Sequence, residues 1–445
     1  AAEADVNIYV AEMRFFRALE YFNKIQLLGD VPWLEVDLNV DSEELYGPKM
    51  KRNQVFQKII EDLDFAIQWL PEAGSEEANR LNKDIARHVK ARFCLNEGTH
   101  YKYHDELEYA SEAEKWLQMA ATESDKLITS GRYEIYNTGH PQEDYFNMYR
   151  IDDKSDLKEA VLYVDYKTNI REHNMAAAGR EAGCGFSKSF VESFLCSDGL
   201  PISLSNKYLG DETMRKETAN RDPRLKQLIL TNDFPTNVTD DLKDSTFVVN
   251  EDEFITQHCF TGYRPIKGFN PIYSQALYMK SSFDGIAYRY AETLLINAEA
   301  KAELNTITDA DLDRTINQLR DRVGMPHLTV NVGFTDPKWP DWGYSLSPIL
   351  QEIRRERCIE LAGEGFRFND LKRWKAGKLL NNVLTYVGKR KPDGNLAIVY
   401  PNYTNPDLSY QAGKSRTWED KMYLYPIPTG ELQRNPQLLP QNPGW

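Results

Sequence analysis

The sequence holds little cysteine, and the spacing of its cysteines excludes two common frameworks. Five cysteines occur in 445 residues, an odd total, and none forms a C-x-x-C pair. A disulfide framework needs paired cysteines, and a zinc ribbon needs C-x-x-C knuckles. We therefore interpret these residues as scattered core or surface thiols. They are Cys94, Cys184, Cys196, Cys259 and Cys358.

Long apolar runs and basic stretches are also missing. No segment approaches the ~20 apolar residues of a membrane helix, so no part of this sequence is expected to span a bilayer. Lys and Arg number 54 against 68 Asp and Glu, which gives a net charge of −14. Phosphate backbones repel such a chain, so nucleic acid is excluded as the main partner. The net charge fits an uncharged or basic ligand better than a polyanion.

The common catalytic motifs are absent as well. The sequence contains no G-x-S-x-G, no G-x-x-x-x-G-K-S/T and no G-x-G-x-x-G. His100 and His104 lie four residues apart on a predicted helix, a spacing that can present two imidazoles to a metal. Tyr101 stands where the H-E-x-x-H pattern needs Glu, so we favour hydrogen-bonded or solvated histidines over zinc ligands. A glycosidase-type acid pair stays possible by count alone, because nothing selects a pair among 68 carboxylates. We predict no catalytic residue and no metal ligand.

Helical patterns are present at both ends of the chain. Apolar residues recur at spacings of three and four in the first part, residues 1–131, which predicts antiparallel helix pairs. The last part, residues 285–445, predicts further helices and a Pro-rich tail at 426–445 that wraps the surface. The helices are expected at 5–29, 53–70, 83–104, 112–128, 286–304 and 309–323, with two more within 346–378, broken near Gly363–Gly365.

The middle part, residues 132–284, is rich in Gly, Asn, Asp, Pro and Ser. Only residues 161–164 and 247–249 have the composition of short strands. A loop-rich segment of this length in an ordered protein is usually functional. We expect the three parts to form one intertwined unit, with the ligand site in the middle part.

A dense charged cluster occupies residues 353–374. Glu356, Glu360 and Glu364 repeat at intervals of four, which alone would repel. Arg357 and Arg367, each three residues from a glutamate, can offset that repulsion. The cluster is either a charged active site or an ion-pair network that connects two helices, and we favour the network.

Aromatic residues are abundant, at 12% of the chain, and many fall in loop-like segments. A flat ring on a loop suits sugar binding, because the C–H-lined face of a pyranose stacks on it and nearby polar side chains bind the hydroxyls. Many of these rings could instead anchor loops onto the helices. The candidate ligand-binding residues are Tyr208, Tyr263, Phe269, Tyr273 and Tyr278 in the middle part, and Trp339, Trp342 and Tyr344 in a Pro/Gly loop that precedes the charged cluster.

Five motifs in order along the chain resemble one family. Residues 17–32 end in Gly-Asp-Val-Pro, and residues 51–71 follow with Ile-x-Asp-Leu-Asp-x-Ala-Ile-x-x-Leu-Pro. Residues 289–300 read Arg-Tyr-Ala-Glu through Ala-Glu-Ala, and residues 353–374 match a long signature, with Cys358 where Arg is commoner. The text from Tyr425 to Trp445 completes a resemblance to the SusD/RagB family over the whole chain.

The resemblance implies a mainly α fold of tetratricopeptide-like helix pairs with a loop-rich, irregular ligand-binding subdomain. It implies a non-catalytic lipoprotein on the surface of a Bacteroidetes-type outer membrane. Such a protein binds oligosaccharides and delivers them to a SusC-like TonB-dependent transporter. The chain starts at Ala1, downstream of the family's N-terminal lipid anchor, so we expect the anchor outside this sequence. The family's motifs are scaffold, and no binding residue is transferred from them.

Two expectations remain open from the sequence. No cofactor is expected, although the Asp-rich loops could accommodate a structural calcium ion outside any EF-hand. The alternative function is a helical-repeat scaffold that binds peptides or protein partners.

Overall fold

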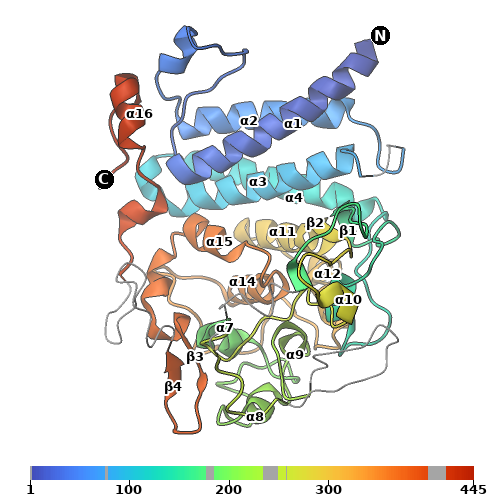
Figure 1. The fold of residues 1–445 in the computed structure, drawn as a ribbon. Coiled ribbons are helices and arrows are strands. Elements are labelled where there is room, and N and C mark those ends of the chain that lie inside the picture. The colour runs from blue at the N-terminus through green and yellow to red at the C-terminus, as the bar shows by residue number, and fades with distance from the viewer. Residues whose placement is uncertain (1–2, 76–78, 177–184, 234–248, 257, 399–416) are drawn as a thin grey trace. The chain divides into compact units, whose positions relative to one another are not determined.

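The computed structural model describes residues 3–75, 79–176, 185–233, 249–256, 258–398 and 417–445, and it is mainly helical (Figure 1). The predicted strand at 247–249 lies outside the described residues except for Val249. In the described part of the chain, no helix is both long enough and apolar enough to cross a membrane.

Contacts divide the chain into two compact units. The first unit comprises residues 1–127, 371–377 and 418–445, and the second comprises residues 128–370 and 378–417. This grouping differs from three consecutive ranges, because two C-terminal segments return to the first unit. The loop-rich middle part, residues 132–284, belongs wholly to the second unit.

Four long helices form the first unit. They are α1 (Glu3–Leu28), α2 (Arg52–Trp69), α3 (Lys83–Tyr103) and α4 (Ala110–Thr129) (Figure 1). Helix α1 packs on α2, and α2 packs on α3. The Phe22 and Phe93 rings stack with centroids 3.6 Å apart, and Phe56 meets Trp116 edge-on at 4.8 Å. Apolar faces at helical spacing therefore produce the predicted antiparallel helix layer.

The C-terminal tail is fastened to the end of α1 within this unit. The Tyr425 amide donates to the Leu27 carbonyl at 2.7 Å, and the Asn442 side chain donates to the Leu28 carbonyl at 2.9 Å. The tail contains the short helix α16 (Thr429–Arg434).

The second unit is built around a strand pair followed by a buried helix. Strand β1 (Ala160–Val164) pairs antiparallel with β2 (Gly285–Arg289), and α11 (Tyr290–Glu303) follows β2 directly. The helix expected from residue 286 therefore begins four residues later, because residues 286–289 pair with β1. Helix α11 packs on α14 (Pro348–Glu360), which is capped by the Ser347 side chain.

The remaining elements are short, as the composition of the middle part predicts. The α-helices are α5 (Asp144–Tyr149), α7 (Lys188–Ser193), α8 (Met214–Thr218), α9 (Arg224–Leu228), α10 (Tyr273–Ala276), α12 (Asp309–Asp313), α13 (Ile316–Arg322) and α15 (Arg367–Arg373). A second hairpin joins β3 (Val387–Arg390) to β4 (Leu396–Ile398). The 3-10 helices are η1 (Glu43–Tyr46), η2 (Asp105–Leu107), η3 (Gly377–Asn381), η4 (Val383–Thr385), η5 (Asp420–Tyr423) and η6 (Pro436–Leu438).

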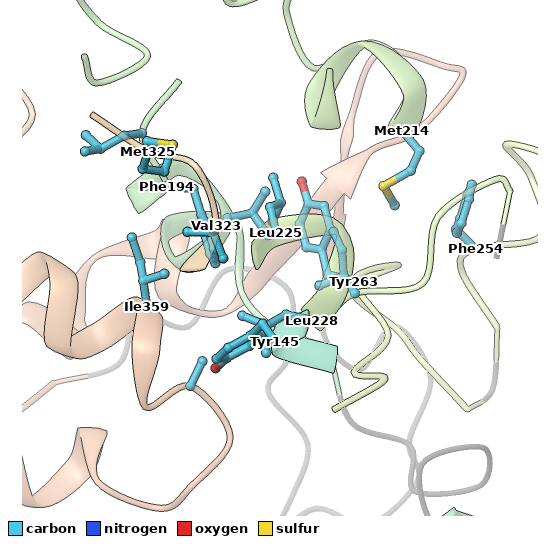
Figure 2. Packing of buried hydrophobic residues seen from close by; sticks show 14 of the residues in the cluster. Tyr145, Phe194, Met214, Leu225, Leu228, Phe254, Tyr263, Val323, Met325 and Ile359 are labelled. Atoms are coloured by element: carbon cyan, nitrogen blue, oxygen red, sulfur yellow. The ribbon is translucent and has the colours of Figure 1, made fainter. Parts of the chain in front are cut away.

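Two apolar clusters hold the loops of the second unit. In the larger one, Figure 2 shows Phe194 and Ile359 on the left of the view and Met214 and Phe254 on the right, with Leu225 between them. Each such side chain contributes about 1.5–3 kcal/mol when it is fully buried. The smaller cluster lies beneath the candidate site and consists of Phe146, Ala176, Ile266, Phe269 and Phe283.

Candidate functional site

Two loop segments of the second unit, residues 165–176 and 268–284, are bonded to each other and are called the paired loops below. His173 and Ser281 exchange backbone hydrogen bonds of 2.8 and 3.1 Å. The Asn174 side chain accepts the Met279 amide at 3.0 Å. Because these bonds join segments far apart in sequence, the two loops form one structural element.

At the base of the paired loops, the buried residues Asp284 and Lys154 form several hydrogen bonds. The Asp284 carboxylate accepts the amides of Lys154 and Tyr166 at 2.9 and 2.8 Å. The Lys154 ammonium donates to the Asp284 carbonyl at 2.5 Å and to the Ile151 carbonyl at 2.6 Å. Burial lowers the pKa of Lys154 to about 8. The smaller apolar cluster lies under the same residues, so the loops are held from below by packing and hydrogen bonds.

The paired loops expose several large apolar side chains. Tyr273 at the start of α10 is 59% exposed, and Tyr278 is 72% exposed. Met279 adopts a left-handed backbone conformation, with φ of 56°, in the turn that follows Tyr278. The other exposed apolar side chains are Ile170, Met175, Leu277 and Met279. Clustered apolar exposure of this kind is typical of a binding surface.

Two of the predicted site residues, Tyr273 and Tyr278, therefore lie together on the paired loops. Phe269 belongs to the same loops but points into the smaller cluster and is only 6% exposed. Tyr263 is fully buried in the larger cluster, where its hydroxyl donates to the Glu217 carboxylate at 2.8 Å. Neither Phe269 nor Tyr263 presents a ring face to a ligand in this structure, because packing covers both.

Tyr208 lies outside the paired loops. Its ring is half-buried, with the Arg221 guanidinium 5.3 Å from the ring centroid. Burial raises the pKa of its hydroxyl above the usual value. The structure does not bring Tyr208 together with Tyr273 and Tyr278 through any contact among the described residues.

The Pro/Gly loop of Trp339, Trp342 and Tyr344 braces α14. The Trp339 ring nitrogen donates to Glu352 at 2.7 Å, and the Trp342 ring nitrogen donates to Gln351 at 2.6 Å. The Tyr344 hydroxyl accepts from Arg354 at 3.1 Å. These bonds hold the loop against the helix, with the Trp342 ring buried and the Trp339 and Tyr344 rings half-buried.

The charged cluster forms a buried ion-pair network. Glu360 contacts Arg322, Arg289 and Arg224 at 2.6, 2.6 and 3.0 Å. Glu364 contacts Arg289 and Lys267, both at 2.6 Å. Burial raises the pKa of Glu360, but the charges of the three arginines outweigh it and hold that pKa well below its usual value. A carboxylate in this state has no proton to donate at neutral pH, which is unsuited to general-acid catalysis.

Arg357, one of the two arginines expected to offset these glutamates, pairs with other acids. Arg357 pairs with Asp370 at 2.9 Å and lies 3.9 Å from Glu299. Glu356 pairs instead with Arg224 at 2.5 Å and Arg320 at 3.1 Å. The cations in contact with Glu356, Glu360 and Glu364 come from other elements of the fold.

The His104 ring is engaged in hydrogen bonds, and the His100 ring stacks against it. His104 contacts the Glu106 carboxylate and the Lys372 carbonyl, both at 2.8 Å, and its ring stacks on His100 at 4.0 Å. The Glu97 carboxylate binds Arg52 at 2.5 and 2.9 Å. Within the described residues, no group of three His, Cys, Asp or Glu side chains is placed to hold a metal ion.

The exposed apolar residues on the same loops as the two tyrosines were not predicted from the sequence. Ile170, Met175, Leu277 and Met279 are aliphatic or thioether side chains in a loop-rich segment, and they show no periodicity. The glycine at position 268 was the one sequence feature that could have indicated a close approach of the two loops. It has φ of 73°, and a Cβ there would lie 2.7 Å from the Met175 sulfur, so the backbone approaches closely at the junction of the loops.

Known proteins resemble the chain in sequence and in fold. A family model described as the SusD family matches residues 127–445. The "SusD-like protein P2" of Formosa agariphila is 25% identical over 456 residues, which cover 100% of this chain and 75% of that protein.

Solved structures match over the full chain. A SusD-like protein from Bacteroides fragilis NCTC 9343 has a TM-score of 0.73 at 24% identity. The match covers 100% of this chain and 81% of that chain. A structure described as a SusD-like carbohydrate binding protein of the same organism has a TM-score of 0.71 at 23% identity, with 99% of this chain and 81% of that chain covered. These matches confirm the predicted fold class, which is mainly α and SusD-like.

Proposed function

Because the chain belongs to the SusD family, as its five motifs predicted, we propose that it is a non-catalytic glycan-binding protein. The observation that supports this function is the pair of exposed tyrosines, Tyr273 and Tyr278, on the rigidly held paired loops. Oligosaccharides would bind there by stacking on the rings, and nearby polar groups would bind the sugar hydroxyls.

Because the paired loops are held in place, their exposed rings are suited to ligand binding. Ordering a loop at the moment of binding costs free energy, and a loop already fixed by hydrogen bonds avoids most of that cost. The Asp284 and Lys154 contacts and the smaller apolar cluster fix these loops from below. Tyrosine also adds little to this cost, because it has few rotatable bonds.

We further propose that the protein acts at the cell surface, bound to the outer membrane by a lipid anchor outside this sequence, and delivers glycans to a SusC-like TonB-dependent transporter. The family motifs support this placement. Co-purification with such a transporter from detergent-solubilised outer membranes tests it. Recovery of the protein without any transporter, under mild detergent, would contradict the delivery step.

The glycan proposal is tested by calorimetry or affinity electrophoresis over a panel of oligosaccharides, without turnover. We expect the double variant Tyr273→Ala, Tyr278→Ala to bind the best glycan at least tenfold more weakly, which corresponds to about 1.4 kcal/mol. The matched control is Tyr9→Ala, which removes an equally exposed tyrosine, 63% exposed, from α1. Its affinity should equal that of the wild type.

Other outcomes would separate the alternatives. Wild-type affinity in the double variant would remove the paired loops as the site. Peptide binding that survives the double substitution, with no glycan bound, would favour the helical-repeat scaffold. Product formation from any glycan by the pure protein would contradict the non-catalytic role.

A further inference from the structure

The first of the paired loops contains a small hairpin with two cations opposite each other. Lys167 and Arg171 exchange backbone hydrogen bonds of 2.8 and 2.9 Å. Asn169, with φ of 62°, adopts the left-handed conformation that the three-residue turn requires. Residues opposite each other in an antiparallel pair project their side chains to the same face, so the two cations are neighbours.

Neither cation has an acidic partner among the residues that the structure describes. Glu172, the adjacent acid, is paired with Lys280 at 3.1 Å. Asp165 forms no ion pair with either cation in the described part. Both side chains are exposed. Like charges directly opposite each other destabilise a strand pair, so this arrangement is unfavourable until an anion binds between them.

Arg171 is oriented for such a contact. Its guanidinium lies 4.9 Å from the centroid of the Tyr166 ring, and Tyr166 in turn meets His173 edge-on at 4.5 Å. This contact holds the guanidinium against the ring, and its fork of N–H donors matches the geometry of an oxyanion. Lys167 beside it supplies a second, mobile positive charge.

The hairpin is part of the same element as the exposed tyrosines. The Thr168 hydroxyl contacts the Ser282 hydroxyl at 3.0 Å, and His173 pairs with Ser281. Tyr273 and Tyr278 precede these serines on the same segment. The two cations and the two exposed rings therefore belong to one hydrogen-bonded element.

We propose that the paired loops bind an acidic oligosaccharide, with Lys167 and Arg171 forming the subsite for its oxyanion. This inference rests on the proposed glycan-binding function and specifies its ligand class. The local charge of the hairpin is opposite to the net charge of −14, which alone would disfavour an anionic ligand. The oxyanion is either the carboxylate of a uronic acid or a sulfate ester, since both offer oxygens to a guanidinium fork.

The experiment measures the affinity of the full chain for three oligosaccharides of similar length: an oligogalacturonate, a sulfated galactan fragment and a neutral gluco-oligosaccharide. We expect the wild type to bind one of the two anionic probes at least tenfold more tightly than the neutral one. The double variant Lys167→Gln, Arg171→Gln should lose that preference. Its dependence on salt between 50 and 500 mM should also become shallower, because two charge contacts are removed.

The control variant changes the net charge by the same amount as the hairpin variant, but at surface positions outside the paired loops. Lys216→Gln with Arg434→Gln removes two exposed cations that are paired with Glu212 and Glu431. Its affinities and salt dependence should match the wild type. Thermal melting checks folding of the hairpin variant, and we expect an equal or higher melting temperature, because a like-charge repulsion is removed.

The results distinguish this inference from the function on which it rests. Tight binding of a neutral glycan, with no preference for either anionic probe, would overturn the acidic ligand and leave the glycan-binding function intact. An anionic preference that persists in the hairpin variant would overturn the subsite. Failure of every glycan in this panel and in the wider one would overturn the function itself.

Discussion

At the scale of single residues, Glu360 is the side chain on which the second unit depends most clearly. It is fully buried and is the one carboxylate that Arg224, Arg289 and Arg322 share, although each arginine also contacts another acid. We expect Glu360→Gln to lower the free energy of unfolding by about 3–5 kcal/mol, because it removes the negative charge that three buried cations share. Chemical denaturation with urea measures this change.

The control for Glu360 is Glu431→Gln. Glu431 pairs with Arg434 at 2.6 Å, but both side chains are at least half exposed. Exposed pairs of this kind contribute less than about 1 kcal/mol, so the free energy of unfolding should stay within that range. Equal effects of the two substitutions would mean that the Glu360 network stabilises no more than a surface ion pair.

The sequence predicts the existence of this network but not its partners. The spacing of Glu356 and Glu360 places them on one face of α14, with Glu364 just beyond its end, which is a local property. Arg224, Arg289 and Arg322 come from three separate elements, so no local spacing could identify them. The same limit applies to the rings. Tyr263 and Tyr278 occur in sequence segments of similar, loop-like composition. Only tertiary packing decides that Tyr263 is buried and Tyr278 exposed.

At the scale of elements, the loop that contains Trp339 and Trp342 is a brace for α14. Trp342 is 5% exposed, and the Arg354 guanidinium lies 4.7 Å from its ring centroid. We expect Trp342→Ala to lower the free energy of unfolding by about 3–5 kcal/mol, because it leaves a cavity and an unpaired Gln351. Glycan affinity of the folded variant should be unchanged.

Tyr278→Ala is the opposite case and serves as the control for Trp342. Its ring is mostly exposed, so we expect a loss of less than about 1 kcal/mol in stability together with weaker glycan binding. Urea unfolding and calorimetry on both variants test the pair. Weaker glycan binding by well-folded Trp342→Ala would return this loop to the candidate site.

Element prediction from the sequence succeeded where the signal was local. The periodic faces of the first four helices, and the stop signals after them, place their ends within a few residues of the observed ones. Strand β2 was missed, because residues 286–289 have no strand pattern of their own and become a strand by pairing with β1. The paired loops could not be predicted either, since bonds such as His173 to Ser281 join distant segments.

At the scale of the whole molecule, the acids held in ion pairs make the stability of the fold depend on pH. Burial raises the pKa values of Glu360, Glu364 and Asp211, but the cations around each of them outweigh it and lower all three, that of Asp211 to about 2. The unfolded chain has these pKa values near 4. Each group therefore stabilises the fold fully above about pH 5, and that contribution is lost as pH falls through the folded-state values.

Thermal melting at pH 7, 5, 4 and 3 tests this expectation. The melting temperature should change little between pH 7 and 5 and fall steeply below about 4.5, because protonation favours the unfolded chain. Glu360→Gln should melt at a lower temperature at neutral pH and show a shallower fall, since it has one depressed carboxylate fewer. A wild-type melting temperature that holds down to pH 3 would show that the ion pairs contribute nothing beyond the cost of burying them. Parallel acid profiles of wild type and variant would assign the loss of stability to acids other than Glu360.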